Sequence, residues 1–197
     1  MPQPITQLPH GYAEVEHLVV TDEKRLLWLN VLALIPLAIS AAAMMGWWLL
    51  ILRVRGGIPG DLVWWAGLLI ILAVLPLHEG LHAAAIRWTG HKPRFGAKLD
   101  KGVLYATSDG ALFRRGEFIV IALAPIVVIT LVGMALMVAL PEWPAFWVGM
   151  AVIVNASSAI GDLWMVVVVR RYAGDTLVRD EADGIRIFTP QQGRALQ

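Results

Sequence analysis

Four long apolar segments constrain the fold of this chain more than any other feature. They run from about residue 26 to 52, 62 to 88, 118 to 140 and 145 to 169. Each exceeds the ~20 residues that a helix needs to cross the hydrocarbon core of a bilayer. With 58% hydrophobic and 16% charged residues, the 197-residue chain is more apolar than a soluble domain. The sequence therefore predicts an all-α membrane protein with four transmembrane helices, embedded in the lipid bilayer.

The charged and sulfur-containing residues exclude several kinds of partner and site. The net charge is +1, and the basic residues form no stripe with interleaved aromatic residues. Nucleic-acid binding therefore has little support. The chain has no cysteine, which excludes disulfides and thiolate metal sites.

Polar sequence precedes, interrupts and follows the membrane core, which we place at residues 26–170. Residues 1–25 form an N-terminal segment, 91–116 a central insert and 171–197 a C-terminal tail. Strand-like runs flank a possible turn at Asp100–Gly102 in the insert and at Asp183–Gly184 in the tail. We expect a small β-hairpin-like insert, a short β-like segment in the tail and a loosely ordered stretch over the first ~20 residues.

The distribution of lysine and arginine predicts the orientation in the membrane. Most basic residues lie before the first apolar segment, between the second and third, and after the fourth. The positive-inside rule then places both termini and the insert in the cytoplasm. Arg53 and Arg55 lie on the opposite side and are a minority.

The second apolar segment ends in HEGLH, residues 78–82. On a helix, His78 and His82 share one face and can bind one metal ion, while Glu79 can act as general base on a metal-bound water. Zinc is the expected ion because imidazole and carboxylate ligands suit it. Within lipid these residues need a reason, since one ionisable side chain at the centre of a span costs about 2.5–3.5 kcal/mol.

A catalytic zinc site usually has three protein ligands, and Asp162 in the fourth segment is the favoured third one. At 1.5 Å per residue, His78 lies ~24 Å along the second segment from Leu62, and Asp162 lies ~26 Å along the fourth from Ala145. The carboxylate is thus expected at the depth of the histidines. The competing ligands are loop residues, where a charged or imidazole side chain needs no special explanation: His91, Asp100 and Asp109.

Asn155 and Ser158 recur with Asp162 at helical spacing and give the fourth segment a polar stripe. Such a stripe should face the interior of the helix bundle. Substrate contact and plain interhelical hydrogen bonding explain the Asn155 and Ser158 side chains about equally well.

These motifs resemble the site-2 protease group of intramembrane zinc metalloproteases. HEGLH, the β-like insert, the Ala-Pro pair at 124–125 and the Asn155 to Asp162 segment carry the resemblance. The chain is more closely similar to a bacterial and archaeal family of short four-helix membrane proteins described as zincin peptidases. The resemblance implies a prokaryotic cell membrane, a role for the insert in positioning substrate and Asp162 as third ligand. Here Asp162 follows glycine and precedes leucine, whereas the site-2 protease pattern is Leu-Asp-Gly.

The sequence and the resemblance together predict an intramembrane zinc endopeptidase. It would hydrolyse a transmembrane segment of a membrane protein near the cytoplasmic face, by zinc-activated water with Glu79 as general base. One alternative is a membrane adaptor with a structural zinc site, in which Glu79 would be dispensable. A metal transporter is less well supported, because the polar residues gather at one depth rather than along a path.

Overall fold

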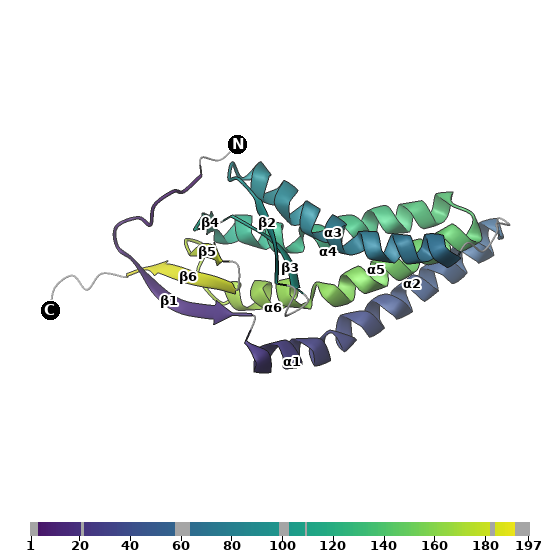
Figure 1. Ribbon diagram of the computed structural model, residues 1–197, viewed down its shortest axis with the longest axis horizontal. Helices are drawn as coiled ribbons and strands as arrows, with labels where there is room; N and C mark the ends of the chain where they lie inside the picture. Colours follow the sequence, from purple (N-terminus) through teal and green to yellow (C-terminus); the bar gives the residue numbers. More distant parts are fainter. Residues whose placement is uncertain are drawn as a thin grey trace. The chain divides into compact units, whose positions relative to one another are not determined.

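The computed structural model describes residues 4–20, 22–57, 64–98, 103–108, 110–181 and 184–191. Six helices lie within these ranges: α1 Glu23–Leu32, α2 Leu34–Arg55, α3 Trp64–Trp88, α4 Arg115–Ala139, α5 Glu142–Ser158 and α6 Ile160–Val169. Six strands lie there as well: β1 Tyr12–Val19, β2 Arg94–Lys98, β3 Val103–Thr107, β4 Leu112–Arg114, β5 Leu177–Glu181 and β6 Gly184–Pro190. Figure 1 shows the course of the chain through these elements.

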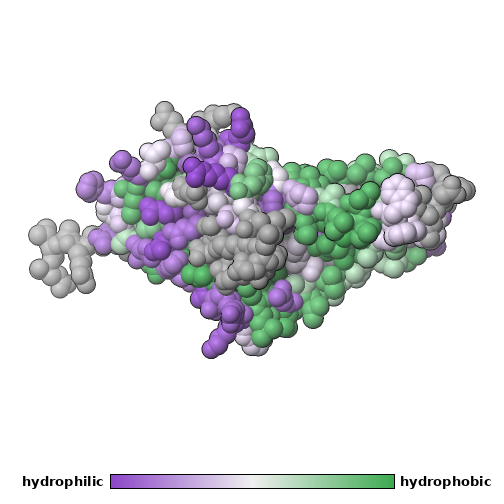
Figure 2. Space-filling model, viewed as in Figure 1, coloured by the Kyte–Doolittle hydropathy of each residue, from purple (hydrophilic) through white to green (hydrophobic). Residues whose placement is uncertain are grey.

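The described residues fall into two compact units. The helical unit comprises residues 27–78 and 125–160, and the sheet unit comprises residues up to 26, 79–124 and from 161 onward. The boundary crosses α3 between His78 and Glu79 and α4 between Ala124 and Pro125. Figure 2 shows hydrophobic side chains over much of the visible surface of the helical unit, and hydrophilic ones over much of that of the sheet unit.

Three helical stretches are long and apolar enough to cross a membrane: Glu23–Arg55, Trp64–Trp88 and Arg115–Ala139. A fourth span results if α5 and α6, which are bent by 45° relative to each other, are counted together. Large apolar side chains on these helices are widely exposed, as expected of a surface that faces lipid. The structure is therefore mostly helical with membrane-spanning candidates, as the sequence predicts, and the number of candidate spans is three or four.

Two of the predicted continuous helices are divided. The first breaks at Ala33, because Pro36 has no N–H to donate to the Leu32 carbonyl and is tolerated only in the first turn of the new helix α2. The fourth breaks at Ala159, whose N–H donates to the Asn155 carbonyl. The Ser158 hydroxyl donates to the same carbonyl, and such local bonds compete with a continuous helix.

Small residues and backbone hydrogen bonds allow close packing within the helical unit. Helix α2 lies beside α5 (Figure 1). A Cβ atom at Gly67 of α3 would overlap the Trp147 ring of α5, so only glycine permits this approach. The Arg55 guanidinium donates to the carbonyls of Met137 and Leu140, 3.2 and 2.8 Å away, at the C-terminal end of α4. Arg55 thereby satisfies carbonyls that the helix leaves open.

The sheet unit is built on a four-stranded antiparallel sheet in the order β1-β6-β5-β4. Its hydrophobic core is formed by residues of the sheet, the end of α3, the start of α4 and α6, among them Ile86, Phe113, Ile121, Val169 and Ile187. The expectation of a loosely ordered N-terminus is wrong, since residues 12–19 form β1 and pair with β6. Pairing with a strand far away in the sequence orders this segment. The alternation of Glu14 and Glu16 with less polar residues suits an edge strand with one solvated face.

The expected hairpin-like pieces are both present. Strands β2 and β3 pair antiparallel as a separate two-stranded sheet, and β5 pairs with β6 in the tail. The predicted turn at Asp100–Gly102 and residue Asp183 of the second turn lie outside the described residues.

Candidate metal centre

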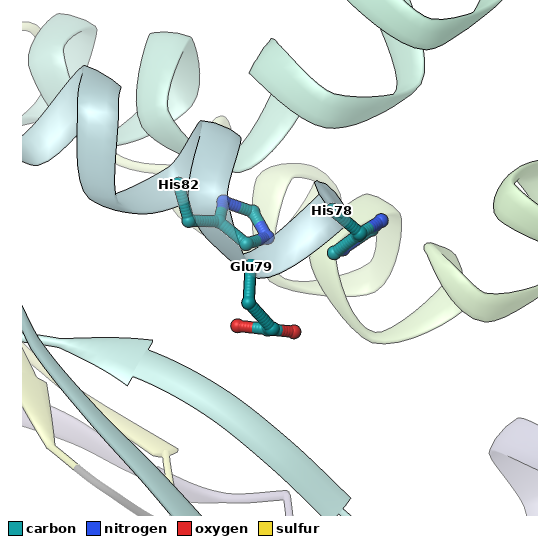
Figure 3. Close-up of side chains that lie close together, drawn as sticks. All are labelled: His78, Glu79 and His82. Carbon is teal, nitrogen blue, oxygen red and sulfur yellow. The ribbon is translucent and has the colours of Figure 1, made fainter. Parts of the chain in front are cut away.

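The HEGLH segment occupies one turn of α3, in the second half of that helix. His78, Glu79 and His82 each offer a ligand atom, and these atoms lie within 4.8 Å of one another (Figure 3). The four-residue spacing of the histidines produces this grouping, because residues i and i+4 share one helix face. His78 and His82 are buried, with 5% and 8% of their surface exposed. Buried imidazoles in an apolar helix require hydrogen-bond partners or a metal ion.

His78 is oriented by a side chain from α5. Its Nδ1–H donates to Asn155 Oδ1 over 2.9 Å. Asn155 is fully buried, and its own Nδ2 donates to the Pro125 carbonyl over 3.4 Å, which fixes the amide so that Oδ1 faces the histidine. Because the proton sits on Nδ1, the neutral ring keeps its lone pair on Nε2, where it can bind a metal.

His82 is oriented by the backbone of α4. Its Nδ1–H donates to the Ile121 carbonyl over 2.9 Å. Its Nε2 faces Asp162 Oδ2 at 3.4 Å, and Asp162 lies in the first turn of α6. The sheet unit thus pairs the second histidine of the motif with the aspartate that the sequence singles out as third ligand.

The spacing of these two atoms fits a zinc ligand pair. Two ligands of a tetrahedral zinc ion, each about 2.0–2.1 Å from it, are about 3.3–3.4 Å apart. The separation of His82 Nε2 and Asp162 Oδ2 is 3.4 Å. Imidazole nitrogen and carboxylate oxygen are both zinc ligands, and orientation of each imidazole through its other nitrogen is the usual arrangement around a bound metal. The side chains of His82 and Asp162 therefore fit a zinc ion.

Glu79 follows His78 directly and is half-buried. In Figure 3 its carboxylate projects away from the helix axis, while its oxygens remain within the same group of ligand atoms as the two histidines. In a motif of this kind the two histidines, four residues apart, bind the metal ion. The glutamate that directly follows the first histidine is placed to exchange protons with water at that site.

The remaining predicted residues have different surroundings. Asn155 bonds His78 of α3 and the Pro125 carbonyl of α4, which confirms the interhelical hydrogen bonding that was one of its two predicted alternatives. Ser158 is exposed, and its hydroxyl bonds the Asn155 carbonyl within its own helix. His91 lies against Thr89 and the Phe113 ring. Asp100 and Asp109 lie outside the described residues.

Sequence reasoning missed the Ile121 carbonyl. Pro125 is the signal that could have found it, because a proline inside a helix frees the carbonyl four residues earlier.

Apolar helices long enough to cross a membrane, together with a buried His-Glu-His group suited to a metal ion, define a class of membrane proteins with a zincin-like centre. A family model described as "Putative zincin peptidase" matches residues 71–177, more than half of the chain, and the protein belongs to this family. The family implies zinc as cofactor, consistent with the His78, Glu79 and His82 group. No curated protein and no solved structure matches the chain.

Proposed function

We propose that this protein is an intramembrane zinc metalloprotease that cuts membrane-embedded or membrane-anchored proteins near the cytoplasmic face. The observation that carries the proposal is the paired orientation of the HEGLH histidines. Each donates its Nδ1–H to a protein acceptor, and the Nε2 of His82 lies 3.4 Å from Asp162 Oδ2. Family membership supports peptidase chemistry in general.

His78, His82 and Asp162 would hold the zinc ion, and Glu79 would act as general base. Zinc, when bound, supplies Lewis acidity that polarises the scissile carbonyl and makes water acidic enough to attack at neutral pH. Glu79 takes the proton from the attacking water and delivers it to the leaving amine. Asn155 and the Ile121 carbonyl hold the two imidazole rings in place during this exchange.

The substrate would be a transmembrane segment that unwinds locally. A peptide bond in a helix has its carbonyl engaged by the helix itself, so an intact helix resists attack. Location in a prokaryotic cell membrane, with both termini in the cytoplasm, is part of the same proposal. The orientation rests on the basic residues of the termini and insert, and the prokaryotic membrane rests on the resemblance described above.

The substitution Glu79→Gln tests the mechanism. We expect cleavage of a single-span reporter protein, reconstituted with the purified protein in liposomes, to fall by about 10²- to 10⁴-fold or more while zinc stays bound. Glu23→Gln is the matched control, because Glu23 is exposed in the first turn of α1 and should leave cleavage unchanged.

Cleavage fragments identified by mass spectrometry and zinc measured by atomic absorption are the two readouts. Cleavage that survives in Glu79→Gln would overturn the mechanism. A wild-type protein that cuts no reporter but unfolds when zinc is removed would instead favour a membrane adaptor with a structural zinc site.

A further inference from the structure

We propose that Pro125 is a positioning residue for His82. By lacking an N–H, Pro125 leaves the Ile121 carbonyl open as the acceptor that keeps the His82 proton on Nδ1 and the metal-binding lone pair on Nε2. The inference rests on the zinc site proposed above. It states that one proline of α4 determines which ring nitrogen of a ligand on α3 carries the proton.

The first step is helix geometry. In an α-helix the N–H of residue i donates to the carbonyl of residue i−4. Helix α4 runs from Arg115 to Ala139, and Pro125 lies well inside it. The Ile121 carbonyl therefore receives no hydrogen bond from residue 125. Ile121 is buried in the core of the sheet unit, where an open carbonyl needs another donor.

The second step is that His82 is that donor. Its Nδ1 lies 2.9 Å from the Ile121 oxygen, a normal hydrogen-bond distance. A carbonyl cannot donate, so the proton of this bond must come from the imidazole. The open carbonyl thus keeps a proton on Nδ1 of His82, and the opposite ring nitrogen, Nε2, lies 3.4 Å from Asp162 Oδ2.

The third step separates this role from a simple helix kink. Helix α3 also contains an interior proline, Pro76, which frees the Leu72 carbonyl by the same rule. That carbonyl holds neither metal histidine, because both Nδ1 atoms already donate elsewhere, to Asn155 and to Ile121. The two prolines lie in similar positions of two 25-residue helices, but only the carbonyl freed by Pro125 accepts a hydrogen bond from the Nδ1 of a metal histidine.

The substitution Pro125→Ala isolates the effect. Alanine restores an N–H that competes with His82 for the Ile121 carbonyl. It also keeps the carbonyl of residue 125, which accepts from Asn155, so the support of His78 is unchanged. Pro76→Ala is the matched control, since it removes an interior proline from the helix that carries the ligands.

Two measurements on purified full-length protein test the proposal without reference to cleavage. Zinc affinity is measured by competition with a chelator, and the tautomers of His78 and His82 by ¹⁵N NMR of histidine-labelled, metal-free protein. For Pro125→Ala we expect affinity to fall about 10- to 100-fold, the range for losing an outer-shell partner of a metal ligand. The His82 signals should shift toward the Nε2–H tautomer, while His78 stays unchanged.

Wild-type affinity and tautomer in Pro125→Ala would overturn the proposal, as would an equal loss in Pro76→Ala. If Pro125→Ala does not fold, the wild-type spectrum decides by itself. His82 must carry a proton on Nδ1, and a ring protonated on Nε2 alone refutes the assignment. The proposed protease mechanism is tested independently. If Glu79→Gln still cleaves, that mechanism is wrong, but the conclusions from the tautomer measurements are unaffected.

Discussion

The two histidines of HEGLH are one helical turn apart and yet are held by different kinds of structure. His78 donates to a side chain, Asn155 of α5, within the helical unit. His82 donates to a backbone carbonyl of α4 and faces the Asp162 carboxylate, both within the sheet unit. A side-chain acceptor can be removed by one substitution, whereas a carbonyl acceptor can be altered only through the backbone that exposes it. Each histidine therefore calls for its own kind of perturbation.

The largest effect should come from the carboxylate that faces His82. We expect Asp162→Ala to lose stoichiometric zinc, as His78→Ala should, because either change removes one of the three proposed ligands. Asp175→Ala is the control, since Asp175 is an exposed aspartate that follows α6 in the chain. Metal content of the purified proteins is the measurement. Full retention of zinc in Asp162→Ala would remove Asp162 from the site and leave His82 supported by the backbone alone.

The difference between the two histidines also marks how far the sequence could predict the site. The helical periodicity of His78 and His82 and their burial follow from local rules, and the depth argument points to Asp162. The structure brings Asp162 Oδ2 to 3.4 Å from His82 Nε2. The roles of Asn155 and Ile121 depend on which helix faces which ring, and the sequence does not contain that information in local form.

The fold shows the same division. Apolar length alone predicts the candidate spans, and strand-like runs on either side of a possible turn predict the β2–β3 and β5–β6 pairs. Strand β1 escaped prediction because its partner β6 lies more than 160 residues away in sequence, as the pairing of Leu18 with Ile185 shows. The break at Ala159 escaped because hydrophobicity is unaffected by a local competition for the Asn155 carbonyl.

An intermediate effect should come from the side chain that holds His78. Asn155→Leu removes both the acceptor for His78 Nδ1 and the donor to the Pro125 carbonyl, with little change in volume. We expect zinc affinity to fall about 10- to 100-fold, because the ring loses its orienting partner. The ¹⁵N spectrum should change at His78 and not at His82, the reverse of the result expected for Pro125→Ala.

Ser158→Ala is the control for this variant. Ser158 belongs to the same polar stripe, but its hydroxyl donates only to the Asn155 backbone carbonyl, which still receives the Ala159 N–H after the substitution. Zinc affinity should be unchanged. Equal losses in the two variants would show that the break between α5 and α6, rather than the Asn155 side chain, governs the orientation of His78.

The smallest effect should come from Tyr172, which belongs to the same sheet unit as His82. Tyr172 lies just after the end of α6, and its hydroxyl donates to the Glu16 carboxylate of β1. This hydrogen bond, with a smaller contribution from burial, raises the pKa of Tyr172 above its usual range. Since the folded pKa is raised, the stabilisation is fully present below the ordinary pKa of about 10 and is lost as pH rises through the folded value.

Tyr172→Phe should therefore lower the melting temperature in detergent at pH 7 by only about 1–2 °C, from a net loss of about 0.5 kcal/mol for a partly exposed hydrogen bond. The difference from wild type should shrink above about pH 10, where the wild-type phenol ionises beside Glu16. Tyr12→Phe, which removes a hydrogen bond to the Asp175 carbonyl, controls for the loss of a phenolic donor. Zinc affinity should not change in either variant, because neither hydroxyl contacts a ligand. A loss of affinity in Tyr172→Phe as large as that in Asn155→Leu would mean that His82 is held by the anchoring of β1 to α6, and not by the local contacts to Ile121 and Asp162.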